Sequence, residues 1–166
     1  MTLLTDEIRA LAGREVSYTA PEELGRAALR YFALAVGDDN PLYVDDEYAR
    51  AHGYEGVIAP PTLICETNQY AGVPRGADGY AGHAWDIDIP GTRLVRGGNA
   101  YTFHRPVRPG DVVTATWRID AVTERTGAGG RPMVVVESTA VYRDQRGEAL
   151  VTNTETLIYV ALEAAG

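Results

Sequence analysis

Hydrophobic and polar residues follow two different periods along the chain, and the change falls near Gly91. Before it, apolar side chains recur at helical spacing over residues 19–37, and shorter helices are indicated over residues 45–53 and 60–72. After it, residues 111–122 alternate between apolar and polar positions, which is the period of a strand with one buried face. The pattern predicts an α+β protein, with helices early in the chain and an antiparallel sheet after them.

The ends of the predicted helices carry recognisable signals. Thr19 and Glu22 have the spacing of a capping box, and Gly37 is suited to a helix end. Pro61 suits the first turn of the helix over residues 60–72, whose mixed apolar surface indicates that it is buried and covers the sheet. The first helix is expected to bury one apolar stripe, made of Leu24, Ala27, Ala28, Tyr31 and Ala35.

Three further segments, rich in Val, Thr and Tyr, are typical of strands. They are residues 93–107, 131–144 and 148–162. The pair Gly97-Gly98 interrupts the first of them and predicts a bulge or a close backbone approach. Residues 71–91 form a glycine-rich connection that is long for a compact domain, and such connections are often functional or mobile.

Composition and charge narrow the class of protein. A chain of 166 residues, 45% hydrophobic and 23% charged, fits one globular domain over residues 1–166. It has neither a membrane-length apolar run nor a signal peptide at its start, so we expect a cytoplasmic protein without a membrane partner. The net charge of -8 argues against a nucleic-acid partner. Four arginines form either a solvated basic face or a local anion site: Arg93, Arg96, Arg105 and Arg108.

Motifs for common cofactors and metals are missing from the sequence, and we expect neither. Cys65 is the only cysteine and lies in an apolar stretch, which favours a packing role. The three histidines are scattered, so surface or structural roles are favoured for them. What remains is "GDDNPLY", residues 37–43, directly after a predicted helix. It is either a helix exit with a rigid turn, or a carboxylate and an amide held at the edge of a pocket.

Two stretches give the chain a family resemblance. "FALAVGDDNPLYVDDEYA" followed by "GVIAPPT", and later "YTFHRPVRPGDVV", resemble the MaoC-like (R)-specific enoyl-thioester hydratases and dehydratases. The N-terminal MaoC or FAS1-like dehydratase branch is the most similar, and the resemblance spans about residues 16–160. It implies a hot-dog fold, in which an antiparallel sheet wraps around a central helix.

Active members of that family have Gly-Asp-x-Asn-Pro-x-His, whose Asp and His hold the water that adds to or leaves the thioester double bond. The resemblance assigns the catalytic positions to Asp38, Asn40 and Tyr43, with Tyr43 where the family has His. A tyrosine with a pKa of about 10 is only about 0.1% ionised at pH 7, whereas histidine titrates near neutrality. The resemblance therefore implies a site that has lost half of its proton-transfer pair.

A second departure lies at the start of the central helix, where the family tends to have Ile-Ala-His-Gly and this chain has "IAPP". Proline lacks the N–H that would polarise a thioester carbonyl, so the first donors are expected on Thr62 and Leu63. The resemblance implies substrate contacts from one short segment, with two arginines as weak candidates for coenzyme A or carrier phosphates. These residues are Ile58, Ala59, Pro60, Thr62, Arg96 and Arg105.

The resemblance therefore predicts a hydratase or dehydratase subunit that binds an acyl-CoA or acyl-carrier-protein thioester. It is expected to pair with a MaoC subunit that has an intact Asp/His pair and to complete that partner's site. Three alternatives stay open. The first is a self-sufficient hydratase or dehydratase, as a homodimer, that uses Asp38 and Tyr43. The second is a thioesterase or polyketide-modifying cyclase of the same fold, and the third is a non-catalytic acyl-thioester-binding module.

Overall fold

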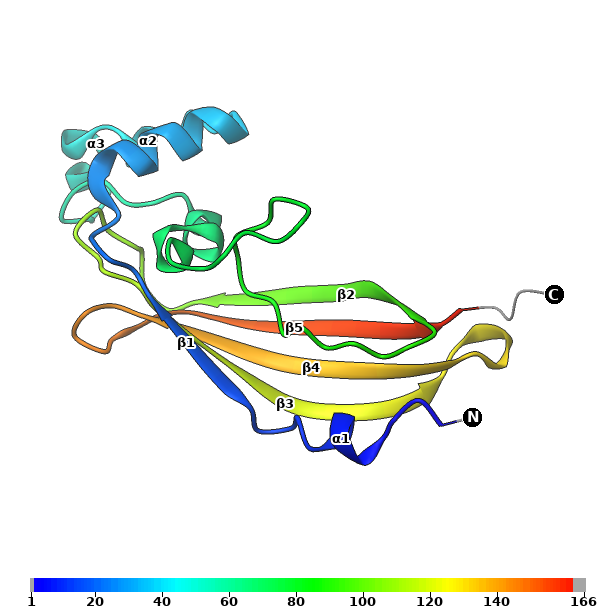
Figure 1. Ribbon diagram of the computed structural model, residues 1–166. Coiled ribbons are helices and arrows are strands. Elements are labelled where there is room, and N and C mark those ends of the chain that lie inside the picture. Colours follow the sequence, from blue (N-terminus) through cyan, green and yellow to red (C-terminus); the bar gives the residue numbers. More distant parts are fainter. Residues whose placement is uncertain (1, 163–166) are drawn as a thin grey trace.

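One antiparallel sheet of five strands, in the order β1-β3-β4-β5-β2, forms the base of the structure (Figure 1). The computed structural model describes residues 2–162, apart from the side chains of Glu66 and Ala128. This sheet, with helices packed on it, confirms the α+β prediction. The strands are β1 (Glu15–Thr19), β2 (Thr92–Phe103), β3 (Thr114–Thr126), β4 (Pro132–Arg143) and β5 (Ala149–Ala161).

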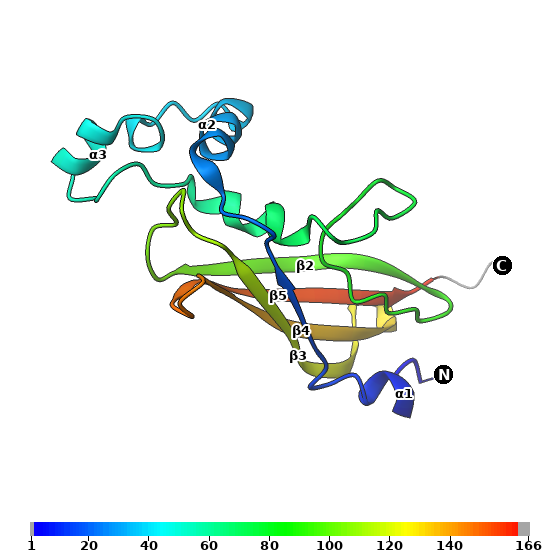
Figure 2. The ribbon, with the colours of Figure 1, turned by 60° about the vertical axis from the view of Figure 1, so that its left-hand side comes forward.

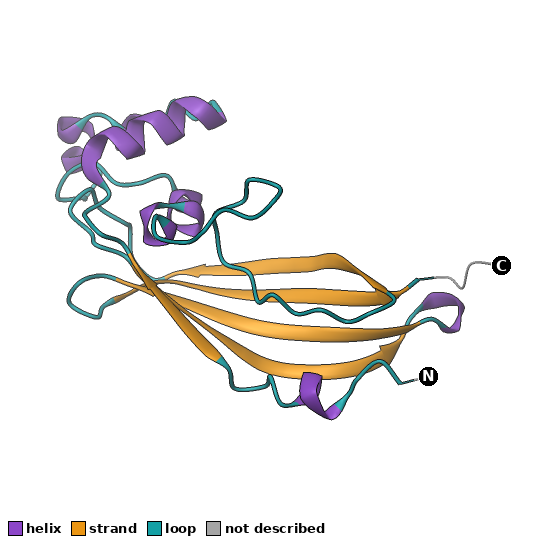
Figure 3. Cartoon of the chain, in the orientation of Figure 1, coloured by secondary structure: helices purple, strands orange, loops and turns teal. Residues whose placement is uncertain are grey.

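The helical segments gather mainly over one end of the sheet. Figures 1 and 2 show α2 (Gly25–Val36) and α3 (Asp46–Ala51) standing off that end, with η2 (Pro61–Glu66) and η3 (Asn68–Tyr70) between α2 and the sheet. Figure 3 shows the strands as one curved layer below this η2–η3 segment. None of the helices described is long and apolar enough to cross a membrane. The remaining short elements are α1 (Asp6–Arg9), η1 (Pro41–Tyr43) and η4 (Ala128–Gly130).

The central helix covers the sheet as expected, but it is two 3₁₀ turns rather than one α-helix. Thr67 separates the turns with an extended backbone, φ -116 and ψ -162. The Gln69 side chain donates through Nε2 to the carbonyl of Ile64 at 2.8 Å. In an α-helix that carbonyl would accept from the amide four residues on, so the Gln69 side chain takes over a backbone bond. Leu63, Ile64 and Tyr70 still pack into the hydrophobic core.

Helix α2 ends at Gly37 as predicted, but its start and its buried face differ from the prediction. Thr19 is the last residue of β1 and pairs with Thr114, so it does not cap the helix, which begins at Gly25. The residues of α2 that are buried are Leu29 and Ala33. Of the predicted stripe, Leu24 is buried just before the helix, but Tyr31 is 63% exposed. Both faces of α2 carry apolar residues, so spacing alone does not identify the buried face.

Three irregularities shift the strand register, and one of them lies between Tyr142 and Arg143, where β4 pairs with β5. The inward positions of β3 follow the predicted alternation up to Ile119. The register against β4 then shifts between Ile119 and Ala121, and Val122 becomes the buried residue. An extra residue in one strand exchanges the two faces beyond it. In β2 the register shifts between Arg96 and Gly98, where Gly98 has φ +149, which confirms the predicted bulge.

His83, in the connection over residues 71–91, is a core residue. Its ring stacks on Trp117 at a centroid distance of 4.3 Å and meets the edge of Trp85 at 4.5 Å. Burial, reinforced by the positive charges of Arg14 and Arg96, lowers the pKa of His83 to about 4. The imidazole is therefore neutral at neutral pH.

Replacing His83 with Phe is expected to weaken the pH dependence of stability between pH 6.5 and 4. In this window the unfolded state takes up a proton that the native state does not, so native stability falls as the pH falls. The difference between the pKa of His83 in the unfolded chain, 6.5, and in the native protein, about 4, corresponds to a loss of at most about 3 kcal/mol in the free energy of unfolding. Urea unfolding of both proteins across this range measures it. The control His52→Phe makes the same exchange at an exposed position and should change the slope less than His83→Phe does. Equal slopes for all three proteins would contradict the expectation.

Candidate functional site

The candidate site begins where α2 ends. Gly37 takes the left-handed conformation, φ +72, that terminates the helix. The amide of Asp38 then donates to the carbonyl of Ala33 at 2.9 Å. This pair of features fixes the backbone of Asp38 against the last turn of α2, so the direction in which its carboxylate leaves the helix is set by the fold.

Two neighbours hold the Asp38 carboxylate. The backbone amide of Asn40 donates to Oδ1 at 3.2 Å, and the hydroxyl of Tyr43 donates to Oδ2 at 3.2 Å. The side-chain oxygen of Asn40 accepts from the amide of Leu42 at 3.1 Å and caps η1. The structure therefore brings the three predicted catalytic residues together, with Asn40 shaping the turn and Tyr43 contacting the carboxylate.

The pairing of Asp38 with Tyr43 has a direct chemical consequence. Burial, together with the hydrogen bond to Asp38 and its negative charge, raises the pKa of the Tyr43 phenol above its ordinary value. Tyr43 is thus protonated across the neutral range and acts as a hydrogen-bond donor. Asp38 is exposed, and its carboxylate is the group in this pair that can accept a proton.

A pocket of about 260 Å³ is lined by the segment that follows this turn, although Asp38, Asn40 and Tyr43 are not among its lining residues. The amide of Ile58 donates to the carbonyl of Leu42 at 3.0 Å, which ties the "IAPP" segment to η1. Ile58, Ala59 and Pro61 then line the pocket from one side. The other side comes from the chain that leaves β2, in the order Phe103, His104, Arg105, Pro106 and Val107, and Tyr54 completes the lining.

Sequence reasoning did not select Phe103 or His104 as site residues. Both lie in "YTFHRPV", the strand motif that carries the family resemblance, so the motif was a usable signal. The Nε2 atom of His104 lies 2.9 Å from the Thr152 hydroxyl, which holds the ring against β5. The pocket thus joins the two stretches on which the resemblance rests.

The start of η2 offers few backbone donors to a thioester carbonyl. Pro60 and Pro61 have no N–H, and the amide of Leu63 donates to the carbonyl of Pro60 at 3.0 Å. Thr62, which is exposed, is the remaining candidate of the two expected donors. Any polarisation of a carbonyl here depends on that single amide.

The two arginines expected near phosphates have different surroundings. All five N–H donors of Arg105 are used by protein oxygens: Nε by Glu148, Nη1 by Asp111 and Pro106, and Nη2 by Asp111 and Asp144. This network gives Arg105 a structural role, and a phosphate would have to displace one of its partners. Arg96 lies on β2, where it pairs with Glu155 at 2.8 Å.

No group of three or more His, Cys, Asp or Glu side chains within residues 2–162 is placed to hold a metal ion.

A five-stranded sheet with a central helix, and an Asp-x-Asn-Pro turn after α2, define a hot-dog protein of the MaoC-like dehydratase class. Residues 10–153 match the model of the FAS1-like, dehydratase domain region, and the chain belongs to this family.

Curated relatives extend over nearly the whole chain. A UPF0336 protein from Streptomyces coelicolor is 35% identical over 157 residues, 95% of this chain and 97% of that protein. A UPF0336 protein from Clavibacter michiganensis is 37% identical over 148 residues, 89% of this chain and 92% of that protein. The family match over residues 10–153, together with the fold of solved dehydratases, confirms the resemblance found in the sequence.

Solved structures share the fold. The ChsH1-ChsH2 complex from Mycobacterium tuberculosis superposes with a TM-score of 0.73 at 23% identity, over 96% of this chain and 89% of that chain. The HadBC complex from the same organism, a (3R)-hydroxyacyl-ACP dehydratase, gives a TM-score of 0.60 at 27% identity, over 87% of this chain and 96% of that chain. These matches confirm the hot-dog fold.

Proposed function

We propose that this chain binds an acyl thioester and completes the active site of a catalytic partner in a MaoC-like hydratase or dehydratase. One observation supports the proposal: Tyr43, buried and protonated, occupies the position where a histidine would transfer protons, and its hydroxyl donates to Asp38. The chain keeps the turn, but the Asp38–Tyr43 pair lacks the imidazole that exchanges protons near neutrality in such a pair. The partner supplies that group as an intact Asp/His pair.

Two surfaces support an assembly. Strand β2 is at the edge of the sheet and exposes Leu94, Tyr101 and Phe103. An edge strand has backbone groups ready to pair with another strand. The outward face of α2 adds the exposed side chains of Tyr31, Leu34 and Val36. Exposed apolar clusters of this kind often mark protein interfaces. HadBC, a dehydratase of similar fold, is itself a complex of two different chains.

The proposal is tested by measuring enoyl-CoA hydration with the chain alone and with a co-expressed MaoC-type subunit that retains Asp-x-x-x-x-His. We expect the assembly to be faster than the chain alone by about 10²–10⁴-fold, the usual contribution of a positioned acid or base. The absorbance of the conjugated enoyl thioester reports the reaction. Equal rates with and without any such partner would contradict the proposal.

A self-sufficient hydratase is the second candidate, because the exposed Asp38 carboxylate can accept a proton. It makes a distinct prediction: Asp38→Asn should abolish turnover by the chain alone. The control Asp39→Asn changes an exposed neighbour by the same chemistry and should leave that turnover unchanged.

A further inference from the structure

A second cavity, of about 80 Å³, lies inside the protein between the η2–η3 segment, the 71–91 connection and the sheet. Its lining is mainly polar and comes from distant parts of the chain. Tyr70 contributes from η3, His83 from the connection, Tyr142 from β4, and Asn153 and Glu155 from β5. Sheet register and the path of the connection bring these residues together.

On the described part of this lining, three side chains have a buried polar atom without a hydrogen-bond partner: His83 (Nε2), Asn153 (Oδ1) and Tyr142 (its hydroxyl). His83 is 7% exposed and Asn153 is 1% exposed. Buried polar atoms in native proteins are nearly always hydrogen-bonded, and leaving them unpaired is costly. The cavity is therefore suited to an occupant that forms hydrogen bonds.

The partners of the His83 and Asn153 side chains indicate which bonds the occupant makes. Nδ1 of His83 lies 3.1 Å from the hydroxyl of Tyr18. We take Tyr18 as the donor of this bond, which puts the ring proton on Nε2 and makes Nε2 a donor. Asn153 donates through Nδ2 to Asn99 at 3.0 Å, so its Oδ1 is left as an acceptor. A hydroxyl group, which both donates and accepts, matches this pair.

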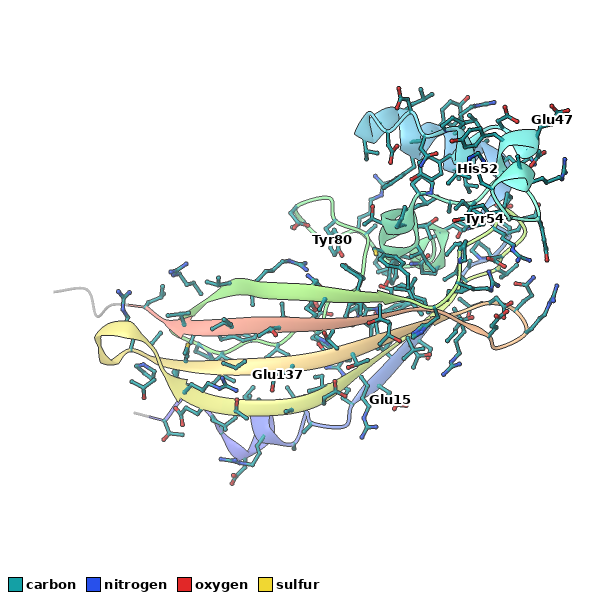
Figure 4. The ribbon with its side chains drawn as sticks, turned by 180° about the vertical axis from the view of Figure 1, so that it is seen from behind. Glu15, Glu47, His52, Tyr54, Tyr80 and Glu137 are labelled. Atoms are coloured by element: carbon teal, nitrogen blue, oxygen red, sulfur yellow. The ribbon has the colours of Figure 1, made fainter. Side chains whose placement is uncertain are left out.

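A wider pocket of about 260 Å³ adjoins the cavity, since Tyr80, His83, Arg96 and Glu155 line both. Figure 4 shows Tyr80 on the loop beside the η2–η3 segment. The walls of the wider pocket include Trp85, Leu157 and Tyr159, which suit an apolar chain.

Charge selects against an anionic occupant. Three carboxylates, Asp78, Asp86 and Glu155, line the wider pocket, and Arg96 is the one basic residue of that lining. A negative local potential repels carboxylates and phosphates. The pocket is thus suited to a neutral group.

The same helix, η2, lines both this cavity and the pocket of the candidate site. Pro61, at the start of η2, lines that pocket, and Cys65 in the same helix lines the interior cavity. Four residues of a 3₁₀ helix advance by about 8 Å. An acyl chain whose thioester lies at the start of η2 therefore has the cavity a few carbon atoms further along.

We propose that this interior cavity binds a neutral hydroxyl group carried by the acyl chain of the substrate, with His83 as donor and Asn153 as acceptor. This inference rests on the proposed function, because it takes the ligand to be an acyl thioester. It names the substrate class as an acyl group with a hydroxyl further along its chain, distinct from the 3-hydroxyl that a dehydratase removes.

Binding tests the proposal without any turnover. The probes are 4-hydroxybutanoyl-CoA, 6-hydroxyhexanoyl-CoA and 8-hydroxyoctanoyl-CoA, each compared with its unsubstituted counterpart. The readout is intrinsic fluorescence, because the two tryptophans of the chain, Trp85 and Trp117, both contact His83. We expect at least one hydroxylated thioester to bind about tenfold more tightly than its counterpart, as a satisfied hydrogen-bond pair allows.

His83→Phe keeps an aromatic ring between the tryptophans but removes the donor, and it should abolish this preference. Asn153→Leu removes the acceptor and provides a second test if the first variant folds poorly. The control His52→Phe should keep the preference. Equal binding of hydroxylated and unsubstituted thioesters, or a preference that survives both substitutions, would overturn the proposal and leave the cavity to ordered water, two or three molecules at about 30 Å³ each.

Free ligands separate this inference from the proposed function. 1,6-Hexanediol and 1-hexanol present the same chemistry without coenzyme A. If the diol binds in a His83-dependent manner while no thioester binds, the ligand is a free alcohol and the assignment to an acyl chain is wrong. If thioesters bind without a hydroxyl preference, the proposed function stands and the hydroxyl site does not.

Discussion

Replacement of Arg105 by Met is expected to lower the free energy of unfolding by about 3–5 kcal/mol, the usual cost of breaking a buried ion pair from one side. Arg105 is 15% exposed and joins Asp111 and Asp144, which are also buried, to the more exposed Glu148. Met fills a similar volume but leaves two buried carboxylates without their cation. The effect should therefore be electrostatic rather than a loss of packing.

Urea unfolding at neutral pH measures this loss, and Arg108→Met is the matched control. Arg108 pairs with Glu55 at the surface, with the two side chains 45% and 79% exposed, so its removal should cost no more than about 1 kcal/mol. Equal losses for the two variants would show that the Arg105 network does not stabilise the fold.

The same network gives the Arg105 prediction a pH signature. Burial alone would raise the pKa of Asp144, but hydrogen bonds from the amides of Glu148 and Arg146 and from Arg105 outweigh it and lower that pKa. A lowered carboxyl pKa adds stability that is present above the unfolded-state value of about 3.9 and is lost as the pH falls below it. The gap between wild type and Arg105→Met should therefore narrow below about pH 4.

The strands were the most predictable part of the fold, because alternation and turn residues act locally. β4 and β5 lie close to their predicted bounds. β1 was not predicted, because Thr19, Pro21 and Glu22 have the residue pattern of a helix start. In the structure Thr19 is instead in a strand, where it pairs with Thr114 of β3. The 3₁₀ form of the central helix depends on a bond from Gln69 to Ile64, which propensity does not reveal.

In the candidate site too, contacts between residues close in sequence could be predicted, and contacts between distant residues could not. Asp38 and Tyr43 are five residues apart, and a short turn brings them into contact, so their meeting followed from a local motif. The interior cavity combines His83 with Asn153, seventy positions later, and only the sheet register places them together. Arg105 was read as a possible phosphate ligand because sequence gives its charge but not the three carboxylates around it.

Replacement of Tyr43 by His is expected to raise enoyl-CoA hydration by the chain alone by about 10²-fold, at the low end of the range for a positioned acid or base. The substitution puts an imidazole next to Asp38, so that the pair has a group that titrates near neutrality. We expect the low end of this range because Pro60 and Pro61 have no N–H to stabilise negative charge on a thioester oxygen.

Two controls tie any gain to the pair. Tyr48→His makes the same exchange on α3, away from Asp38, and should change nothing. The double variant Tyr43→His/Asp38→Asn should lose the gain, because the imidazole then has no carboxylate beside it. If Tyr43→His alone brings no increase while the protein stays folded, the missing histidine does not limit the chain. The deficit then lies at the start of η2, where two prolines stand at the helix entrance.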